Sequence, residues 1–328
     1  MPFDIHNRRY IGSKATLSDW ILESVDPRLH GGTFFDVFGG TGVVSAAATK
    51  TFDKIIVNDF LYSNEVIYRA FFGRGAIRKT LLPELRSLAE TLAKEDNYVS
   101  ANFGGKFFTP STARAIGAWR EAIEMVLPDK KDRTRNYFLA SLLYSADRSA
   151  ITVGHYEAFL RNGVERDFQF DVVNPLKVSA RIFRQDSNEV VRKVKSDVAY
   201  VDPPYNSRQY SRFYHVLETL TKWDSPELFG VALKPAPENI SDYCKVGAAD
   251  ALLDLIQNID AKQILISYNN TYDSKSSSSK NRVSLDDLKA IAQTRGKVKV
   301  LEKSHKHFNA GNTDFADHRE LLFVIEVS

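Results

Sequence analysis

The stretch TFFDVFGGTGVVSAAATKTFDKIIVNDF, residues 33–60, contains an apolar run, a glycine-rich turn, a pattern of small residues typical of a helix, and a second apolar run. A strand, a helix and a second strand within roughly 30 residues make up the βαβ unit of nucleotide-binding sheets. Residues 33–60 therefore predict a parallel sheet that places a ligand at the carboxyl ends of its strands.

The composition is that of an ordinary globular protein. The chain has 328 residues, of which 43% are hydrophobic, enough for one large domain or two smaller ones. No apolar run reaches the length of a membrane span and the first residues are polar, so we expect neither a membrane segment nor a secretory signal. The single cysteine, Cys244, rules out an intramolecular disulfide framework and a cysteine-based zinc cluster. A net charge of +3 permits a polyanionic partner without requiring one.

The apolar runs predict the rest of the architecture. Between residues 61 and 173, helical patterns with interleaved aromatic and arginine residues replace the strand–helix alternation. We expect an α/β fold with a mostly parallel sheet in 1–62 and 175–328, and a helical insertion in 63–174. Further strands are expected in VSARIFRQDS (178–187), VAYVDPPY (198–205) and KQILISYNN (262–270), with an antiparallel pair in KVKVLEKS (297–304) and ELLFVIEV (320–327).

A carboxylate and two prolines follow the strand predicted at 198–201. Asp202 would lie at its carboxyl end, while Pro203 and Pro204 stiffen the backbone and remove two N–H donors. What remains is a cluster of hydrogen-bond acceptors beside the ring of Tyr205. Such a cluster suits a planar group that donates hydrogen bonds. The alternative is a structural Asp-Pro-Pro turn with a core tyrosine.

The glycine turn indicates the type of ligand. Gly39, Gly40 and Gly42 match neither the G-x-G-x-x-G fingerprint nor a phosphate-binding loop that ends in Gly-Lys-Ser/Thr, so a pyrophosphate is not favoured. Asp59, at the end of the next strand, is placed to accept hydrogen bonds from ribose hydroxyls. The pattern predicts a nucleoside without phosphates. Alternatively, the glycines only allow close packing and Asp59 is a solvated turn residue.

Taken together, four motifs resemble a known family. RRYIGSK (8–14), FFDVFGGTG (34–42), VNDF (57–60) and VDPPY (201–205) are similar to the motif series of S-adenosylmethionine-dependent DNA N6-adenine methyltransferases, in the alpha-group order. In that order the cofactor motifs come first, the target-recognition region is inserted, and the catalytic motif follows. The sequence departs from the family at Gly40, where alanine is common.

The resemblance implies a Rossmann-like class I methyltransferase fold, S-adenosylmethionine as cofactor, and no metal. It places Lys14 near the methionine end of the cofactor and Asp186 at the adenine amine. From the residues alone, Lys14 could instead be an exposed helix-start lysine, Asp36 a strand-end cap, Phe38 a core residue and Asp186 a plain turn acid. The expected cofactor-binding residues are Tyr10, Lys14, Asp36, Phe38, Gly39, Gly40, Gly42, Asp59, Phe60, Asp186 and Asp202.

Chemistry and resemblance agree on the catalytic residues Asp202, Pro203, Pro204 and Tyr205. Adenine N6 is a poor nucleophile because its lone pair is delocalised into the ring. If the amine donates to the Asp202 carboxylate and the Pro203 carbonyl, the lone pair can aim at a sulfonium methyl for in-line attack. Tyr205 would stack on a base rotated out of the duplex. By analogy, the initial aspartate favours adenine N6 over cytosine N4.

Contacts to DNA are expected from the insertion and from the segments around the catalytic motif. Phosphate contacts fix the register of a duplex, and side chains in a groove read its bases. The same residues could instead be solvated helix faces or parts of a core. The candidates are Arg148, His155, Tyr156, Arg161, Ser207, Arg208, Gln209, Tyr210, Arg212, Tyr268 and Asn269.

The expected function is site-specific methylation of adenine N6 in double-stranded DNA, as part of a restriction-modification system in a bacterial or archaeal cytoplasm. A cognate restriction endonuclease would act independently, and the enzyme would be a monomer or weak dimer without a membrane partner. The first alternative is the same chemistry on RNA adenine or on cytosine N4 in DNA. The second is a catalytically silent module that binds DNA.

Overall fold

The computed structural model describes residues 2–160, 166–205, 207–269, 282–304 and 319–328. The chain divides into two compact units. A helical unit comprises Met1–Ile11, Leu61–Ser179 and Ser211–Glu238, and a sheet unit comprises Gly12–Phe60, Ala180–Tyr210 and Asn239–Ser328.

The sequence predicted a helical insertion in 63–174. The helical unit of the structure also includes the first eleven residues and residues 211–238. The first residues join that unit because Phe3 forms a β-bridge with Val173. Residues 211–238 join it because helix α10, His215–Lys222, packs against helix α3, Tyr62–Phe72. Both additions rest on long-range contacts that no local sequence pattern reveals.

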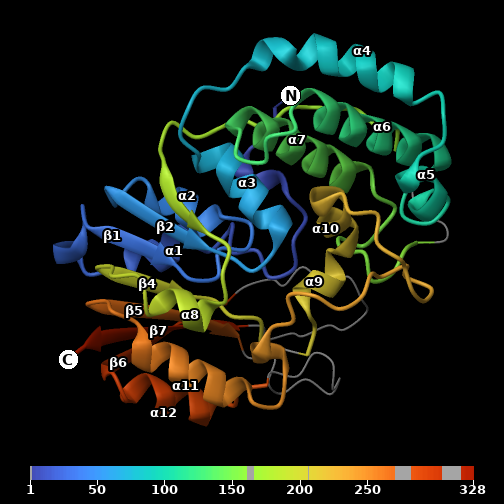
Figure 1. The fold of residues 1–328 in the computed structure, drawn as a ribbon. Helices are drawn as coiled ribbons and strands as arrows, with labels where there is room; N and C mark the ends of the chain where they lie inside the picture. Colours follow the sequence, from blue (N-terminus) through green and yellow to red (C-terminus); the bar gives the residue numbers. More distant parts are fainter. Residues whose placement is uncertain (1, 161–165, 206, 270–281, 305–318) are drawn as a thin grey trace. The chain divides into compact units, whose positions relative to one another are not determined.

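The sheet unit is built on a seven-stranded sheet in the order β3-β2-β1-β4-β5-β7-β6 (Figure 1). Neighbouring strands from β3 to β5 pair in parallel, and β7 lies antiparallel between β5 and β6. The predicted α/β fold class, mostly parallel with antiparallel C-terminal strands, is confirmed. The strands are β1 Thr33–Asp36, β2 Lys54–Asn58, β3 Ala180–Phe183, β4 Val198–Val201, β5 Gln263–Asn269, β6 Gly296–Ser304 and β7 Arg319–Val327.

Helices of the sheet unit form two groups. Helix α2 packs against α1, β1 and β2, whereas α8, α11 and α12 form a second group in which α12 packs on β6 and β7. Figure 1 shows α11 and α12 together along one side of the sheet. The helices are α1 Ser18–Glu23, η2 Pro27–Leu29, α2 Val43–Ala48, α8 Ser187–Val191, η4 Asp242–Cys244, α11 Ala248–Asn258 and α12 Leu285–Gln293.

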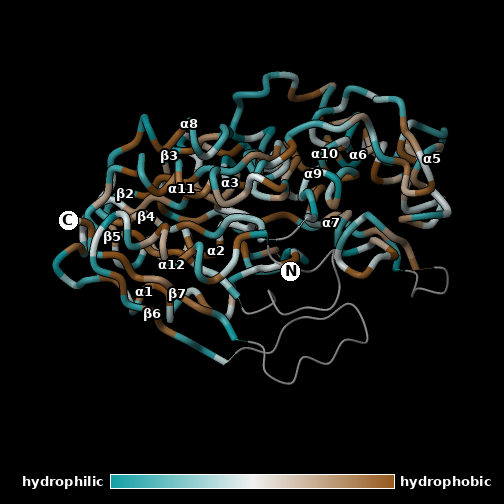
Figure 2. The backbone as a smooth tube through the Cα atoms, turned by 90° about the horizontal axis from the view of Figure 1, so that it is seen from below, coloured by the Kyte–Doolittle hydropathy of each residue, from teal (hydrophilic) through white to brown (hydrophobic). Residues whose placement is uncertain are grey.

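Strand periodicity explains why both faces are covered. Successive side chains of a strand point to opposite faces. Phe35 therefore joins the core shared with α8, α11 and α12, while Phe34 contacts Phe52 and Tyr200. All residues of β4 and β5 are buried, and the central strands are coloured largely hydrophobic in Figure 2. The near-continuous apolar runs of these strands are typical of a sheet buried on both sides.

The helical unit has its own core. Helix α7 is buried along most of its length, and Trp119 of α6 stacks on Phe170 with ring centroids 3.7 Å apart. None of the helices that the structure describes is long and apolar enough to cross a membrane. The elements are η1 Ile5–Asn7, α3 Tyr62–Phe72, η3 Lys79–Leu81, α4 Leu82–Leu92, α5 Tyr98–Phe103, α6 Pro110–Val126, α7 Arg133–Ser149, α9 Tyr210–Phe213, whose first residue belongs to the sheet unit, and α10 His215–Lys222.

The carboxyl group of Asp36 lies inside the sheet unit. Asp36, the last residue of β1, is 1% exposed and its Oδ2 accepts a hydrogen bond of 2.7 Å from the Ser45 hydroxyl of α2. Its Oδ1 is buried without a hydrogen-bond partner among the described residues. Burial raises the pKa of Asp36 to about 7, and the negative charges of Asp202 and Asp59 contribute further. The carboxylate form of Asp36 therefore destabilises the fold.

We predict that Asp36→Asn changes the pH dependence of stability. Because the folded-state pKa of Asp36 is raised to about 7, the stability linked to its protonation is present below the pKa of an unfolded aspartate and is lost as the pH rises toward 7. Asparagine keeps an oxygen for Ser45 and carries no charge. The free energy of unfolding of the variant, measured in urea, should exceed that of the wild type by on the order of 1 kcal/mol or more at about pH 8.

The same difference should be small at about pH 4, where both side chains are neutral in the folded protein. Asp53→Asn is the matched control, because Asp53 is exposed and precedes β2. A stability difference for Asp36→Asn that stays constant over this pH range would contradict the assignment.

Candidate functional site

Acidic residues gather at one edge of the sheet. Asp36 ends β1, Asp59 and Asp202 directly follow β2 and β4, and Asp186 follows β3 closely. These strands are parallel neighbours, so their carboxyl ends meet at the same edge. From β1 the chain continues to β2 and β3 on one side in the sheet order, and from β4 it continues to β5 on the opposite side. This is the topological switch point at which open α/β sheets bind their ligands.

The glycine turn after β1 is held in a conformation that favours glycine. Gly40 and Gly42 have φ angles of 53° and 80°, in the left-handed region that other residues rarely adopt. The Gly39 N–H donates to the Asn58 carbonyl at 2.8 Å, and the Gly40 N–H donates to Asp59 Oδ2 at 2.9 Å. Asp59 thus connects the end of β2 to the turn between β1 and α2.

A pocket of about 550 Å³ lies beside this edge. Phe38, from the glycine turn, packs edge-on against the ring of Tyr243, with centroids 5.1 Å apart. Asp186 caps helix α8, because its Oδ1 accepts from the backbone N–H groups of Asn188 at 2.9 Å and Glu189 at 3.3 Å. Asp186 is therefore a helix cap, a role that neither expectation for this residue included, and it also lines the pocket. The pocket is lined by Asp186, Asn188, Glu189, Asp242, Tyr243, Lys245, Gly247, Asp250, Ala251 and Asp254.

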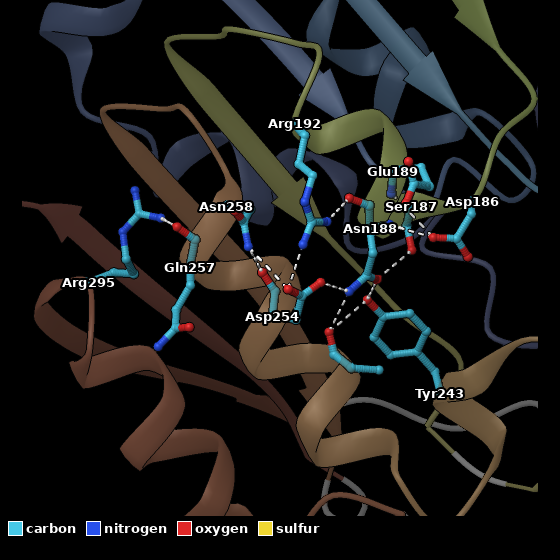
Figure 3. Close-up of polar contacts among 11 residues, drawn as sticks. Asp186, Ser187, Asn188, Glu189, Arg192, Tyr243, Asp254, Gln257, Asn258 and Arg295 are labelled. Atoms are coloured by element: carbon cyan, nitrogen blue, oxygen red, sulfur yellow. Dashed lines mark hydrogen bonds and ion pairs between the residues drawn. The ribbon is translucent and has the colours of Figure 1, made fainter.

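Asn188 joins the walls of the pocket (Figure 3). The Tyr243 hydroxyl donates to Asn188 Oδ1 at 2.6 Å, while Asn188 Nδ2 donates to Asp254 Oδ2 at 2.7 Å and to the Ala251 carbonyl at 2.9 Å. Arg192 forms an ion pair of 2.6 Å with Asp254. The network links α8, η4 and α11. Sequence reasoning missed Asn188 and Tyr243, because neither belongs to a motif and their pairing spans a long stretch of chain.

The Asp202 carboxylate has close partners on both oxygens. The Tyr205 hydroxyl donates to Oδ1, and Lys14 Nζ lies 3.3 Å from Oδ2. The Tyr205 ring packs edge-on against Tyr268, with centroids 5.1 Å apart. Pro203 is buried and Pro204 half-buried between the acid and the ring. The structure thus brings together the four predicted catalytic residues, and their roles remain a prediction.

Lys14 is a buried residue rather than an exposed helix-start lysine. It is 5% exposed, and its Nζ lies 5.5 Å from the centre of the Tyr205 ring and 3.9 Å from Oε2 of Glu320. Burial lowers the pKa of Lys14, but the charges of Asp202 and then Glu320 outweigh it, so the pKa is raised overall. Lys14 is therefore a cation held between two carboxylates.

Glu320 was not among the predicted site residues. It lies on β7, is 4% exposed, and burial raises its pKa to about 7. The sequence signal for it is weak, because Glu320 begins the segment 320–327 and a glutamate at the start of a strand is ordinarily solvated. The pairing of β7 with β5 brings Glu320 opposite Asn269 and toward the predicted catalytic motif.

Several candidate DNA-binding residues are engaged within the helical unit. Tyr156 is completely buried and its hydroxyl donates to Asp147 at 3.2 Å, which is the core alternative for this residue. Arg148 pairs with Asp171 at 2.7 Å. Nδ1 of His155 accepts from the Glu157 N–H at 3.2 Å. Arg161 lies outside the described residues.

The remaining candidates lie in both units. Gln209 pairs with the backbone of Ser241 through two hydrogen bonds, of 2.9 and 2.8 Å. Arg212 donates to the Pro235 carbonyl in the helical unit, where the ring of Tyr10 also stacks on Tyr214. Their roles toward DNA or cofactor remain predictions. The other candidates lie in the sheet unit. There, the backbone carbonyl of Arg208 accepts a hydrogen bond from the Cys244 thiol. The side chains of Ser207, Tyr210 and Phe60 are half-buried, and those of Tyr268 and Asn269 are buried.

The sheet edge fits a phosphate-free, cationic nucleoside. Its side chains are mainly acidic, and the lysine among them, Lys14, is paired with Asp202. Carboxylates suit ribose hydroxyls, amines and a sulfonium, and they repel phosphate. The orphaned Oδ1 of Asp36 adds a buried acceptor to this edge. Among the described residues, no group of three or more His, Cys, Asp or Glu side chains is placed to hold a metal ion.

Comparison with known proteins agrees with this chemistry. The chain is 28% identical to the type II methyltransferase M.NlaIII of Neisseria lactamica and 30% identical to M.CviAII of Paramecium bursaria Chlorella virus 1, in each case over 97% of this chain and 98% of the relative. It is 28% identical to the modification methylase LlaI of Lactococcus lactis subsp. lactis, matching 93% of this chain. The chain spans only 52% of the length of LlaI.

The family model for D12 class N6 adenine-specific DNA methyltransferases matches residues 10–270, most of the chain. The match covers most of the RRYIGSK segment, the glycine turn, the helical insertion and the predicted catalytic motif. It confirms the family resemblance that the four motifs indicated. The chain belongs to the D12 class of N6 adenine-specific DNA methyltransferases.

Proposed function

We propose that the protein transfers the methyl group of S-adenosylmethionine to N6 of an adenine at a specific site in double-stranded DNA. The observation that carries the proposal is the position of Asp202. It lies at the carboxyl end of β4, the direct neighbour of β1, and β1 leads into the glycine turn. A nucleoside cofactor on that turn would have its reactive end beside the acceptor cluster at the switch point.

Each part of the cofactor would have its own residues at the sheet edge. Asp59 would accept from the ribose hydroxyls, and the backbone at Gly40 and Gly42 lets the ligand approach closely. The pocket lined by Asp186 and Tyr243 is suited to the adenine ring, and Phe38 packs against Tyr243. When bound, the cofactor supplies a methyl group activated by a positive sulfur.

The acceptor cluster would prepare the base for attack. Asp202 and the Pro203 carbonyl accept the two N–H bonds of the adenine amine, which directs the nitrogen lone pair toward the methyl group. As the nitrogen–carbon bond forms and the carbon–sulfur bond breaks, the electron pair stays on sulfur. One amine proton then leaves, with Asp202 as its nearest acceptor. Tyr205 releases its hydrogen bond to Asp202 and stacks on the base.

The names of the relatives support a wider proposal. We infer that the enzyme is the modification component of a restriction-modification system, since the relatives are named as type II or modification methylases. It would act as a monomer or weak dimer in the cytoplasm, independently of a cognate endonuclease. The helical unit, rich in arginine and lysine, would supply contacts that fix the register of the duplex.

The substrate assignment predicts where a labelled methyl group ends up. With labelled S-adenosylmethionine, duplex DNA should acquire the label in N6-methyldeoxyadenosine, because the acceptor cluster suits an extruded purine amine. Structured RNA, single-stranded DNA and duplex DNA should be assayed in parallel, followed by digestion to nucleosides. Label confined to RNA, or found in N4-methyldeoxycytidine, would establish one of the alternative substrates.

Replacement of the catalytic acid should separate binding from chemistry. We expect Asp202→Ala to reduce kcat by about 1000-fold, since the amine loses its charged acceptor, while the affinity for S-adenosylmethionine changes by less than about threefold. Single-turnover methylation and calorimetry measure the two quantities. Asp260→Asn, at an exposed position of the sheet unit, is the control. Unimpaired turnover by Asp202→Ala would refute the mechanism.

Asp59 should affect cofactor binding rather than chemistry. Asparagine at this position keeps an oxygen for the Gly40 N–H but loses the charge that strengthens hydrogen bonds from ribose hydroxyls. We expect Asp59→Asn to weaken S-adenosylmethionine binding by about tenfold, with kcat at saturating cofactor within about twofold of the wild type. An unchanged dissociation constant would show that Asp59 only supports the turn.

A further inference from the structure

The buried ammonium of Lys14 lies between two carboxylates. Its Nζ is 3.3 Å from Asp202 Oδ2 and 3.9 Å from Glu320 Oε2. Lys14 and Glu320 are 5% and 4% exposed. Oε2 of Glu320 is buried and accepts no hydrogen bond from any residue that the structure describes. The Lys14 ammonium therefore faces two carboxylates. The more distant one, Glu320, has an oxygen that accepts no hydrogen bond from the described residues.

Glu320 faces charged and titratable groups from several elements. It lies on β7 between Asn269 of β5 and Lys303 of β6, its partners in the two ladders. The ammonium of Lys303 lies 5.7 Å from the centre of the Trp20 ring. The other groups that interact with Glu320 are the Lys14 ammonium, the Asp202 carboxylate and the hydroxyls of Tyr200 and Tyr205. Of the two ammonium groups, Lys14 is the one within ion-pair distance.

Catalysis requires Asp202 to exchange partners. To accept from an adenine amine, the carboxylate must give up part of its interaction with the Lys14 ammonium, which otherwise withdraws charge from it. A buried ammonium left without a counter-charge is strongly destabilising. Lys14 therefore needs a second anion within a short movement of its flexible side chain. Glu320 is that anion in this structure.

We propose that Glu320 is a positioning residue that takes up the Lys14 ammonium while Asp202 receives the adenine amine. Glu320 contacts neither base nor cofactor in this scheme. It acts by keeping Lys14 paired and the Asp202 carboxylate fully charged at the moment of attack. The inference rests on the proposed function, because it assumes that Asp202 accepts from the substrate amine.

The exchange needs Glu320 to be ionised. Burial raises the pKa of its carboxyl to about 7, and the negative charge of Asp202 adds to this while Lys14 opposes it. Below that pH the neutral acid cannot pair with the ammonium, so Lys14 stays on Asp202. The rate of methyl transfer should consequently rise with pH through about 7 and level off above it.

The test is the pH profile of kcat for Glu320→Gln, an isosteric change without charge. At about pH 8.5 we expect kcat to fall about tenfold, and the rise near neutral pH to flatten, while KM for S-adenosylmethionine and for DNA stays within about twofold. Glu320→Asp should restore part of the rise. Glu326→Gln is the control, because Glu326 is exposed on the same strand. A wild-type profile for Glu320→Gln would overturn the proposal.

Coupling to Lys14 distinguishes positioning from general structural damage. In the Lys14→Met background, Glu320 has no ammonium to receive, so adding Glu320→Gln should change kcat by less than about twofold. Full additivity of the two effects would overturn the proposal. Cofactor affinity and melting temperature identify any variant that fails to fold.

A second measurement is independent of turnover. The stability difference between wild type and Glu320→Gln, followed with pH, reports the pKa of Glu320, and loss of the Lys14 charge should shift that pKa upward. An absent shift would show that the two residues do not pair. If the wild type transferred no methyl to DNA adenine, the proposed function would fail, and with it the catalytic role of Glu320. The shift would still show whether the pair exists.

Discussion

The buried ion pair between Lys14 and Asp202 is the constraint on which the site depends. A lysine that is 5% exposed must be paired, since an isolated ammonium in a protein interior costs several kcal/mol. Lys14 comes from the segment before β1, Asp202 from the end of β4, and Glu320 from β7. These segments, distant in the chain, must meet for the charges to be satisfied. The pair therefore fixes the position of the VDPPY motif as well as its charge.

The same edge is suited to a cofactor without phosphates. Parallel strands bring Asp36, Asp59, Asp186 and Asp202 to one edge of the sheet. The Gly40 N–H donates to Asp59 and is not available to a phosphate. An anion would meet repulsion there, whereas a sulfonium and a ribose would meet acceptors. The acidic edge and the family membership thus point to the same ligand class, and Asp36, Asp59 and Asp202 belong to the motifs that indicated the family.

The helical unit shows why composition is a poor guide to recognition. Many of its arginines and aromatic residues support its own fold. Arg120 is completely buried and donates to the Leu220 carbonyl at 2.7 Å, and Tyr156 is likewise buried. A segment rich in arginine and lysine can therefore present few charged side chains to DNA. Residues that read bases have to be sought among exposed side chains, which a count of arginines does not distinguish from those in a core.

The sequence by itself determined the βαβ start, the strand ends that carry Asp59 and Asp202, and the antiparallel C-terminal pair. These features follow from local periodicity, glycine placement and strand length, all of which are properties of adjacent residues. Only the tertiary structure decided that Lys14 is buried, that Glu320 lies beside the Lys14–Asp202 pair, and that Asn188 accepts a hydrogen bond from Tyr243. Those contacts depend on strand order and on burial, which are set by the packing of remote segments and leave no mark on the residues nearby.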